Sequence, residues 1–161
     1  MSQGPFITTA VLCDQVIEGK DGVLSAIRLV DTVTLTKFAA GQPIKLPADG
    51  QITPDFLTFN FLVTIKSGDF RGRGKVKLEP KLPSGRALPA RTVDVELFGD
   101  EKGQHIIFRG GFVPTEEGIH WFDVYFEDRL LTRSPLAVRI VQSDSQTTTS
   151  SSAEESNQGK K

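Results

Sequence analysis

The stretch HWFDVYFEDRLLTRSPLAVRIV, residues 120–141, decides the fold class. Apolar and polar residues alternate along it, stop at the charged turn EDR, and then alternate again. A period of two places successive side chains on opposite faces of an extended strand, so the stretch is predicted to form a β-hairpin. One face of the hairpin is apolar and is expected in the core: Phe122, Val124, Phe126, Leu136, Val138 and Ile140. Pro135 cannot donate a ladder hydrogen bond, which predicts an edge or a bulge at that point.

The same alternation recurs through most of the chain. Its longest run is residues 56–66, where one face is apolar: Leu57, Phe59, Phe61, Val63 and Ile65. Further strands are predicted at residues 6–17, 23–35, 76–78, 92–97 and 106–112. The sequence EGKDG at 18–22 supplies a turn between the first two of these. No window of eleven residues has the 3.6-residue apolar stripe of a helix, so about eight strands separated by turns predict an all-β antiparallel sandwich.

The composition is that of one globular domain. The chain has 161 residues, 38% of them hydrophobic and 24% charged, and its formal net charge of −1 gives no global attraction to nucleic acid or membranes. The single cysteine, Cys13, excludes an internal disulfide and fits a reducing compartment. The first residues lack the features of a signal peptide, and there is no run of about 18 apolar residues. We therefore expect a cytoplasmic protein with no membrane partner; the same features would suit a phage virion.

Local composition divides the chain into three parts. Residues 1–5 are expected to be flexible, and residues 6–141 to form the sandwich domain. Residues 142–161 contain nine Ser or Thr and no aromatic residue, which predicts a disordered tail. Within the domain, residues 41–54 contain three prolines and two glycines and are predicted to be a long connection between strands.

Three segments together resemble a known family. They are LCD at 12–14, GVLSAIRLVDTV at 22–33 and EEGIHWFDVYFEDRLLTRSPLAVRI at 116–140. They look like a family of small bacterial proteins with a single immunoglobulin-like β-sandwich domain and no established activity, in which a Gly-x-aromatic motif precedes the last hairpin. This chain departs from the motif, because His120 stands at the aromatic position. The resemblance spans about residues 6–141 and implies an immunoglobulin-like sandwich of about seven to nine strands, without implying any chemistry.

Residues that could carry chemistry each have a structural interpretation that we favour. Cys13 is expected in the middle of a strand, without the basic neighbour that would activate a thiolate. His120 shares the apolar face of the last hairpin and is expected to be a buried, hydrogen-bonded core residue. His105 is expected to point outward, and neither histidine has partners at the spacing of a zinc site.

Two further patterns do not predict a catalytic site. Carboxylate pairs can be drawn among four acids, but acids on a sheet usually line its solvated face. These four are Asp94, Glu96, Asp123 and Glu127. The sequence GRGK at 72–75 is followed by a strand, whereas a phosphate-binding loop opens a helix. We predict a non-enzyme with no catalytic residue, no metal site, no cofactor and no small-molecule ligand.

Two surfaces are candidates for binding a partner. The first lies opposite the apolar face of the last hairpin, where Trp121, Asp123 and Tyr125 are expected beside Arg139. Trp, Tyr and Arg are the residues enriched in binding hot spots, so this surface is a candidate protein-interaction face. The alternative is that the connection at 41–54 covers the face within the monomer.

The second surface is basic. Residues 66–91 contain eight basic and two acidic residues, so the remainder of the chain is acidic. Within this segment Arg71, Arg73, Lys75 and Lys77 share one parity, and a strand would line them along one face as a basic ribbon. Such a ribbon could contact phosphates or an acidic protein, or it could simply protect an edge strand from aggregation.

The sequence therefore favours a non-enzymatic sandwich module that works by protein contact or self-association. An adaptor, or a component of a larger bacterial or phage assembly, fits this description. The alternative function is a weak nucleic-acid binder that reads the phosphate backbone, without sequence preference, through the basic ribbon in 66–91.

Overall fold

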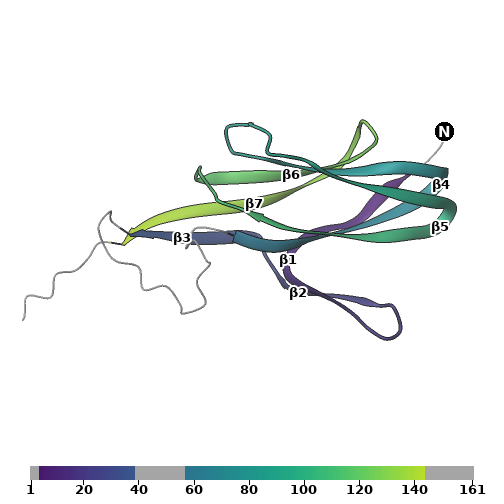
Figure 1. Ribbon diagram of the computed structural model, residues 1–161, viewed down its shortest axis with the longest axis horizontal. Coiled ribbons are helices and arrows are strands. Elements are labelled where there is room, and N and C mark those ends of the chain that lie inside the picture. The colour runs from purple at the N-terminus through teal and green to yellow at the C-terminus, as the bar shows by residue number, and fades with distance from the viewer. Residues whose placement is uncertain (1–3, 39–56, 144–161) are drawn as a thin grey trace, which may run out of the picture.

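The structure is a computed structural model, and it describes residues 4–38 and 57–143 (Figure 1). The described residues contain no helix, and hence no helix able to cross a membrane. Their seven strands are β1 (Phe6–Glu18), β2 (Leu24–Leu29), β3 (Thr32–Phe38), β4 (Leu57–Lys81), β5 (Arg91–Phe112), β6 (Gly118–Phe126) and β7 (Arg129–Ser143). The predicted connection at 41–54 lies outside the described residues, as does the predicted tail from residue 144 onward.

Strands β4 and β5 are long enough to take part in two layers. Residues 57–66 of β4 pair with residues 103–112 of β5 on one side, and residues 60–66 pair with β1 on the other. Residues 71–78 of β4 pair with residues 91–98 of β5, and the last part of β4 also pairs with β6. Between these halves the register shifts, and both strands bend together near the N-terminal end of the molecule (Figure 1). Bulges of this kind let a strand leave one sheet and enter another.

The two halves of β4 and β5 define the layers. The first layer has the order β2-β1-β4-β5, and the second has the order β5-β4-β6-β7-β3. Every pair is antiparallel except β3 with β7, which is parallel. Two layers that are antiparallel except for the pair β3 and β7 face one core and form a sandwich of the immunoglobulin-like class, so the predicted fold class is confirmed. The predicted strands at 56–66 and 76–78 are halves of one strand, because the glycine-rich bend between them keeps its pairing to β5.

The strand predicted at 23–35 is in fact two strands, one in each layer. The turn at 18–22 is present as predicted, with the Gly19 N–H donating to the Val23 carbonyl at 2.8 Å. After β2 the chain crosses to the other layer at Val30 and Asp31. The Val30 N–H donates to the Leu12 carbonyl in the first layer, and the Asp31 carbonyl accepts from Ala137 in the second. The inward parity changes at this crossing, since Val30 and Val33, three residues apart, both pack against the core.

One apolar core fills the space between the layers. Its buried members come from six of the seven strands: Leu12, Leu35, Phe61, Val63, Ile65, Val76, Leu78, Val95, Leu97, Ile106, Phe108, Phe122, Val124, Phe126, Leu136 and Val138. Phe122 of β6 lies at its centre. Its ring stacks on Phe61 across the layers, with centroids 5.6 Å apart, and meets the edge of Phe59 at 5.4 Å. The parity predicted for the last hairpin is therefore confirmed.

Three positions differ from the predicted alternation. Leu62 and Thr64 were expected on the open outer face of the first layer, yet both are buried. They line a groove together with Val23 and Leu29, so the hairpin of β1 and β2 accounts for their burial. Val93 was expected in the core but is 39% exposed, because the first half of β5 is an edge of the second layer.

Pro135 lies where β7 has a neighbour on one side only. It is opposite Trp121 of β6, whereas the parallel ladder with β3 begins two residues later, at Ala137. The missing N–H of proline therefore breaks no ladder there, as the sequence predicted. Just before it, the Ser134 hydroxyl donates to the Ala10 carbonyl of β1 at 2.7 Å and joins the two layers along this side.

We expect Phe122→Ala to lower the free energy of unfolding by about 3–5 kcal/mol, because it empties the centre of the core. Urea denaturation measures the change. Phe98→Ala is the matched control, since its ring is 53% exposed; it should cost about 0.5 kcal/mol or less. Equal losses in the two variants would contradict the core described above.

Candidate protein-interaction face

The outer side of the second layer carries the residues of the predicted interaction face. Trp121, Asp123 and Tyr125 alternate outward along β6, while Phe122 and Val124 point into the core. Strand β6 lies between β4 and β7. Side chains from three strands therefore meet on this surface, which we call the outer face.

Strand register decides which of these side chains become neighbours. It sets up four opposed pairs: Lys77 with Tyr125, Glu79 with Asp123, Lys81 with Trp121, and Arg133 with Asp123. Opposed side chains on one face of an antiparallel pair lie about 4.5–5.5 Å apart at Cβ, close enough to interact. The register therefore surrounds one carboxylate and two aromatic rings with cations.

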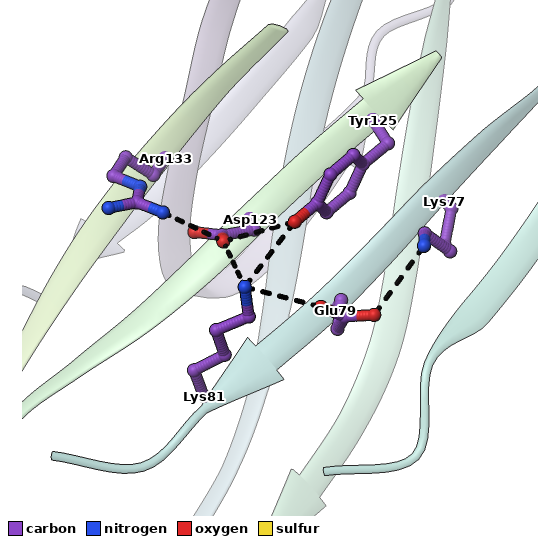
Figure 2. Close-up of polar contacts among 6 residues, drawn as sticks. All are labelled: Lys77, Glu79, Lys81, Asp123, Tyr125 and Arg133. Atoms are coloured by element: carbon purple, nitrogen blue, oxygen red, sulfur yellow. Dashed lines mark hydrogen bonds and ion pairs between the residues drawn. The ribbon is translucent and has the colours of Figure 1, made fainter. Parts of the chain in front are cut away.

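Asp123 is at the centre of the outer face and is completely buried. Its Oδ2 accepts from Lys81 Nζ at 2.9 Å, from Arg133 Nη2 at 3.0 Å and from the Tyr125 hydroxyl at 3.4 Å (Figure 2). Its Oδ1 has no partner among the described residues. The sequence placed Asp123 on the solvated side of the sheet; it is on that side but is not solvated, because longer neighbours cover it. Charge-assisted hydrogen bonds offset part of the cost of burying this carboxylate.

Lys81 links the carboxylate to the rest of the face. Its Nζ also contacts Glu79 at 3.4 Å and the Tyr125 hydroxyl at 3.4 Å (Figure 2). The hydrogen bonds to Asp123 and then to Tyr125 raise the pKa of Lys81. The ammonium group therefore stays charged at neutral pH. Glu79 also contacts Lys77 at 3.5 Å, so the network extends along β4.

Cations lie over both aromatic rings of the face. Lys77 Nζ is 4.3 Å from the centroid of the Tyr125 ring, and the Arg133 guanidinium is 5.5 Å from that of Trp121. Cation–π contacts of this kind contribute about 0.5–1 kcal/mol at exposed sites. The two rings are half-buried and lie against these cations. Groups fixed in advance lose less entropy on binding.

Apolar side chains extend the outer face beyond Trp121. Ile119 of β6 and Val141 of β7 are each 49% exposed, and Ala137 lies opposite Ile119. Arg139 is exposed on β7 beside them but makes no contact with the Asp123 network. Parity alone places Ile119 outward, although it was not among the predicted site residues. Glu79, Lys81 and Arg133 were not predicted either, because their importance follows from register.

The predicted basic ribbon lies on the same outer face, along β4. Lys77 belongs to both surfaces, because it covers Tyr125. Each of the other three cations faces an acid of β5: Arg71 contacts Asp100 at 3.0 Å, Arg73 contacts Glu96 at 3.9 Å, and Lys75 is opposite Asp94. The acids of the adjacent strand thus offset the charge of the ribbon. The sequence of the basic segment 66–91 could not predict this pairing, because the acids belong to another strand.

Cys13 and Glu127, which were also considered as possible catalytic residues, lie in environments that do not activate them. Cys13 is completely buried; burial, and then the nearby charge of Asp14, raise the pKa of its thiol, so the thiolate is scarce at neutral pH. Glu127 accepts a hydrogen bond from the Lys75 N–H at 2.8 Å. In the described part of the chain, no three His, Cys, Asp or Glu side chains form a group that could hold a metal ion.

The two histidines occupy the positions expected of them. His105 is exposed and lies 3.0 Å from the Thr64 hydroxyl. His120 is 1% exposed and packs on Phe112, and its Nδ1 is 3.4 Å from the Gly118 carbonyl oxygen. Burial lowers the pKa of His120, although the bond to Gly118 and the charge of Glu116 act in the opposite direction.

The fold defines the class of this protein as an immunoglobulin-like antiparallel sandwich domain. An immunoglobulin-like protein from Pseudomonas aeruginosa is similar in structure, with a TM-score of 0.39 and 17% identity over 86% of this chain and 98% of that one. The CARDB domain of a Pyrococcus furiosus protein, solved in complex with di-metal ions, has a TM-score of 0.38 and 12% identity over the same shares. Both TM-scores are below 0.5, so neither likeness bears on function. No protein-family model and no curated protein matches the chain.

We expect the stability of the protein to fall as the pH drops below about 6.5, the ordinary pKa of histidine. The unfolded chain binds a proton at His120 more readily than the folded chain does, so acid favours unfolding. Urea denaturation at pH 7.5 and 5.5 measures the loss. His120→Phe should reduce it, whereas the control His105→Gln should keep it. An unchanged pH dependence in His120→Phe would contradict this assignment.

Removing the cations around Asp123 should cost more stability than removing Asp123 itself. The double variant Lys81→Met, Arg133→Met leaves a buried carboxylate without its ion pairs, and we expect a loss of about 3–5 kcal/mol. Asp123→Asn leaves two cations that reach solvent, with side chains 27% and 48% exposed; its loss should be about 1–3 kcal/mol. Urea denaturation gives both values, and the reverse order would show that Asp123 is not the buried centre of the network.

Proposed function

We propose that this protein is a non-enzymatic sandwich module that works by binding another protein through the outer face of β4, β6 and β7. The observation that carries this proposal is the pair of half-buried rings, Trp121 and Tyr125, which lie under the cations of Arg133 and Lys77. Arg133 is paired with the buried carboxylate of Asp123, and Lys77 with Glu79. Aromatic and arginine side chains that are fixed in place have the composition and rigidity of binding hot spots. Exposed Ile119 and Val141 add apolar area beside them.

The charge of the face supports an acidic partner. Its cations are Lys77, Lys81, Arg133 and Arg139, and its acids are Glu79 and Asp123. This excess of positive charge would oppose a symmetric dimer in which the outer face meets itself, since like charges across an interface are unfavourable. An acidic surface on a different protein, or on another region of a second copy, is complementary.

The role we propose is that of an adaptor, or of a component of a larger bacterial or phage assembly, in the cytoplasm. The lone buried cysteine supports a reducing compartment. Nucleic-acid binding through the basic ribbon receives less support, because acids of β5 lie opposite the three cations of the ribbon that precede Lys77. Such acids would repel a phosphate backbone.

Trp121→Ala tests the proposal. Size-exclusion chromatography with light scattering, over a wide concentration range, reports self-association, and affinity capture from the native cell reports other partners. Truncating a hot-spot residue costs about 2 kcal/mol or more, so we expect at least about a 30-fold loss of affinity in Trp121→Ala. A loss in the same direction is expected for Arg139→Ala.

The matched control is Leu29→Ala, which removes an apolar side chain that is 65% exposed on the other layer. It should bind as the wild type does. The captured partner must bind the purified wild type and must bind it more weakly at high salt. A wild-type protein that is strictly monomeric and captures nothing dependent on Trp121 would contradict the proposal.

A further inference from the structure

An apolar cleft opens between the layers at the end of the sandwich away from the bend of β4 and β5. Its volume is about 310 Å³, at the lower end of the range of small-molecule sites, about 300–1,000 Å³. Its lining includes Phe59, Leu88, Arg91, Arg109, Phe112 and Phe122. The cleft exists because the two halves of β5 form the edges of different layers and diverge toward Arg91 and Phe112, the ends of the strand.

The floor of the cleft is the aromatic part of the core. Phe122 and Phe108 are almost completely buried, while Phe59 and Phe112 are partly buried beside them. The rings of Phe59 and Phe112 meet edge to face, with centroids 5.9 Å apart. A flat apolar group that enters the cleft would therefore contact ring edges and faces that are already fixed.

The rim is cationic. Arg91 and Arg109 are exposed, and among the described residues neither has an acidic partner. The Arg91 guanidinium donates to the Arg109 carbonyl and so bridges the two layers at the mouth of the cleft. Gly110 leaves room for this guanidinium, since a Cβ there would lie 3.2 Å from Arg91 Nη2. An arginine uses one N–H in such a bond and keeps others for a ligand.

We propose that this cleft binds a small aromatic acid, with its ring among the phenylalanines and its carboxylate on Arg91 and Arg109. No acidic residue lines the described cleft, so its charge is complementary to an anion. Asp14 lies on the adjoining surface, but its carboxylate is paired with Arg28 at 3.2 Å. The sequence predicted no small-molecule ligand, because the lining residues come from distant segments. The cleft shares no residue with the outer face, so its function is independent of the proposed protein contact.

Isothermal titration calorimetry with two probes tests the proposal. 2-Naphthoate carries the anion, and 2-naphthamide is a neutral molecule of nearly the same shape. We expect the acid to bind saturably with one site, and the amide to bind about tenfold more weakly, because it lacks the charge-assisted hydrogen bonds to arginine. Amide chemical shifts in NMR should change at Leu88, Gly110 and Gly111.

Variants separate the charge from the apolar floor. Arg91→Gln should lower the affinity for 2-naphthoate about tenfold and leave the affinity for 2-naphthamide unchanged. Leu88→Trp should lower the affinity for both probes, because the larger side chain narrows the cleft. The matched control is Arg73→Gln, since the Arg73 side chain is 87% exposed on the outer face. It should change the affinity for neither probe. Urea denaturation confirms that each variant is folded.

Four results would overturn the proposal. Three concern affinity: the absence of saturable binding of 2-naphthoate to the wild type, an equal affinity for acid and amide, and an equal loss in Arg91→Gln and Arg73→Gln. Shift changes confined to Trp121 and its neighbours would also overturn it, since the probe would then occupy the outer face.

Discussion

The pairing of β4 with β5 on both sides of their common bend is the constraint on which the rest of the structure depends. These two strands stay hydrogen-bonded through most of their length while they pass from one layer to the other. The bend uses Gly68 and Gly99, which have positive φ angles of 54° and 79°. Glycine adopts this conformation at little cost, so the ladder can change direction without ending. Each layer therefore contains one half of the same hairpin, and the apolar faces of the two halves meet in one core.

The position of the outer face follows from this arrangement. The second half of β4 accepts β6 as its other neighbour, and β6 in turn accepts β7. Three strands then present their outward residues in fixed register. The buried carboxylate of Asp123 has a large desolvation cost, which the lysine and arginine beside it partly offset. The network also fixes long side chains over Trp121 and Tyr125, which would otherwise sample many rotamers.

The same hairpin leaves the sandwich open at its other end. At the bend the layers are tied by the continuous chain, and along one side by the hydroxyl of Ser134. Where β5 begins and ends, no shared ladder of the described residues holds the layers together. Arg91 provides a hydrogen bond across this opening, and the phenylalanines of the core line its floor. One topological feature thus accounts for both the outer face and the cleft.

Much of the fold was predictable because it depends on local parity. The alternation in residues 120–141 alone places Phe122, Val124 and His120 inward and Trp121 outward, since successive side chains of a strand must point in opposite directions. The all-β fold class and the turn at 18–22 follow from equally local rules. Parity, however, predicts only the side of the sheet toward which each side chain points. It does not say that Asp123 is buried, that Lys77 covers Tyr125, or that the cations of residues 71–75 face acids from β5. Those contacts join residues tens of positions apart, and only strand order and register, set by packing of the whole core, brought them together.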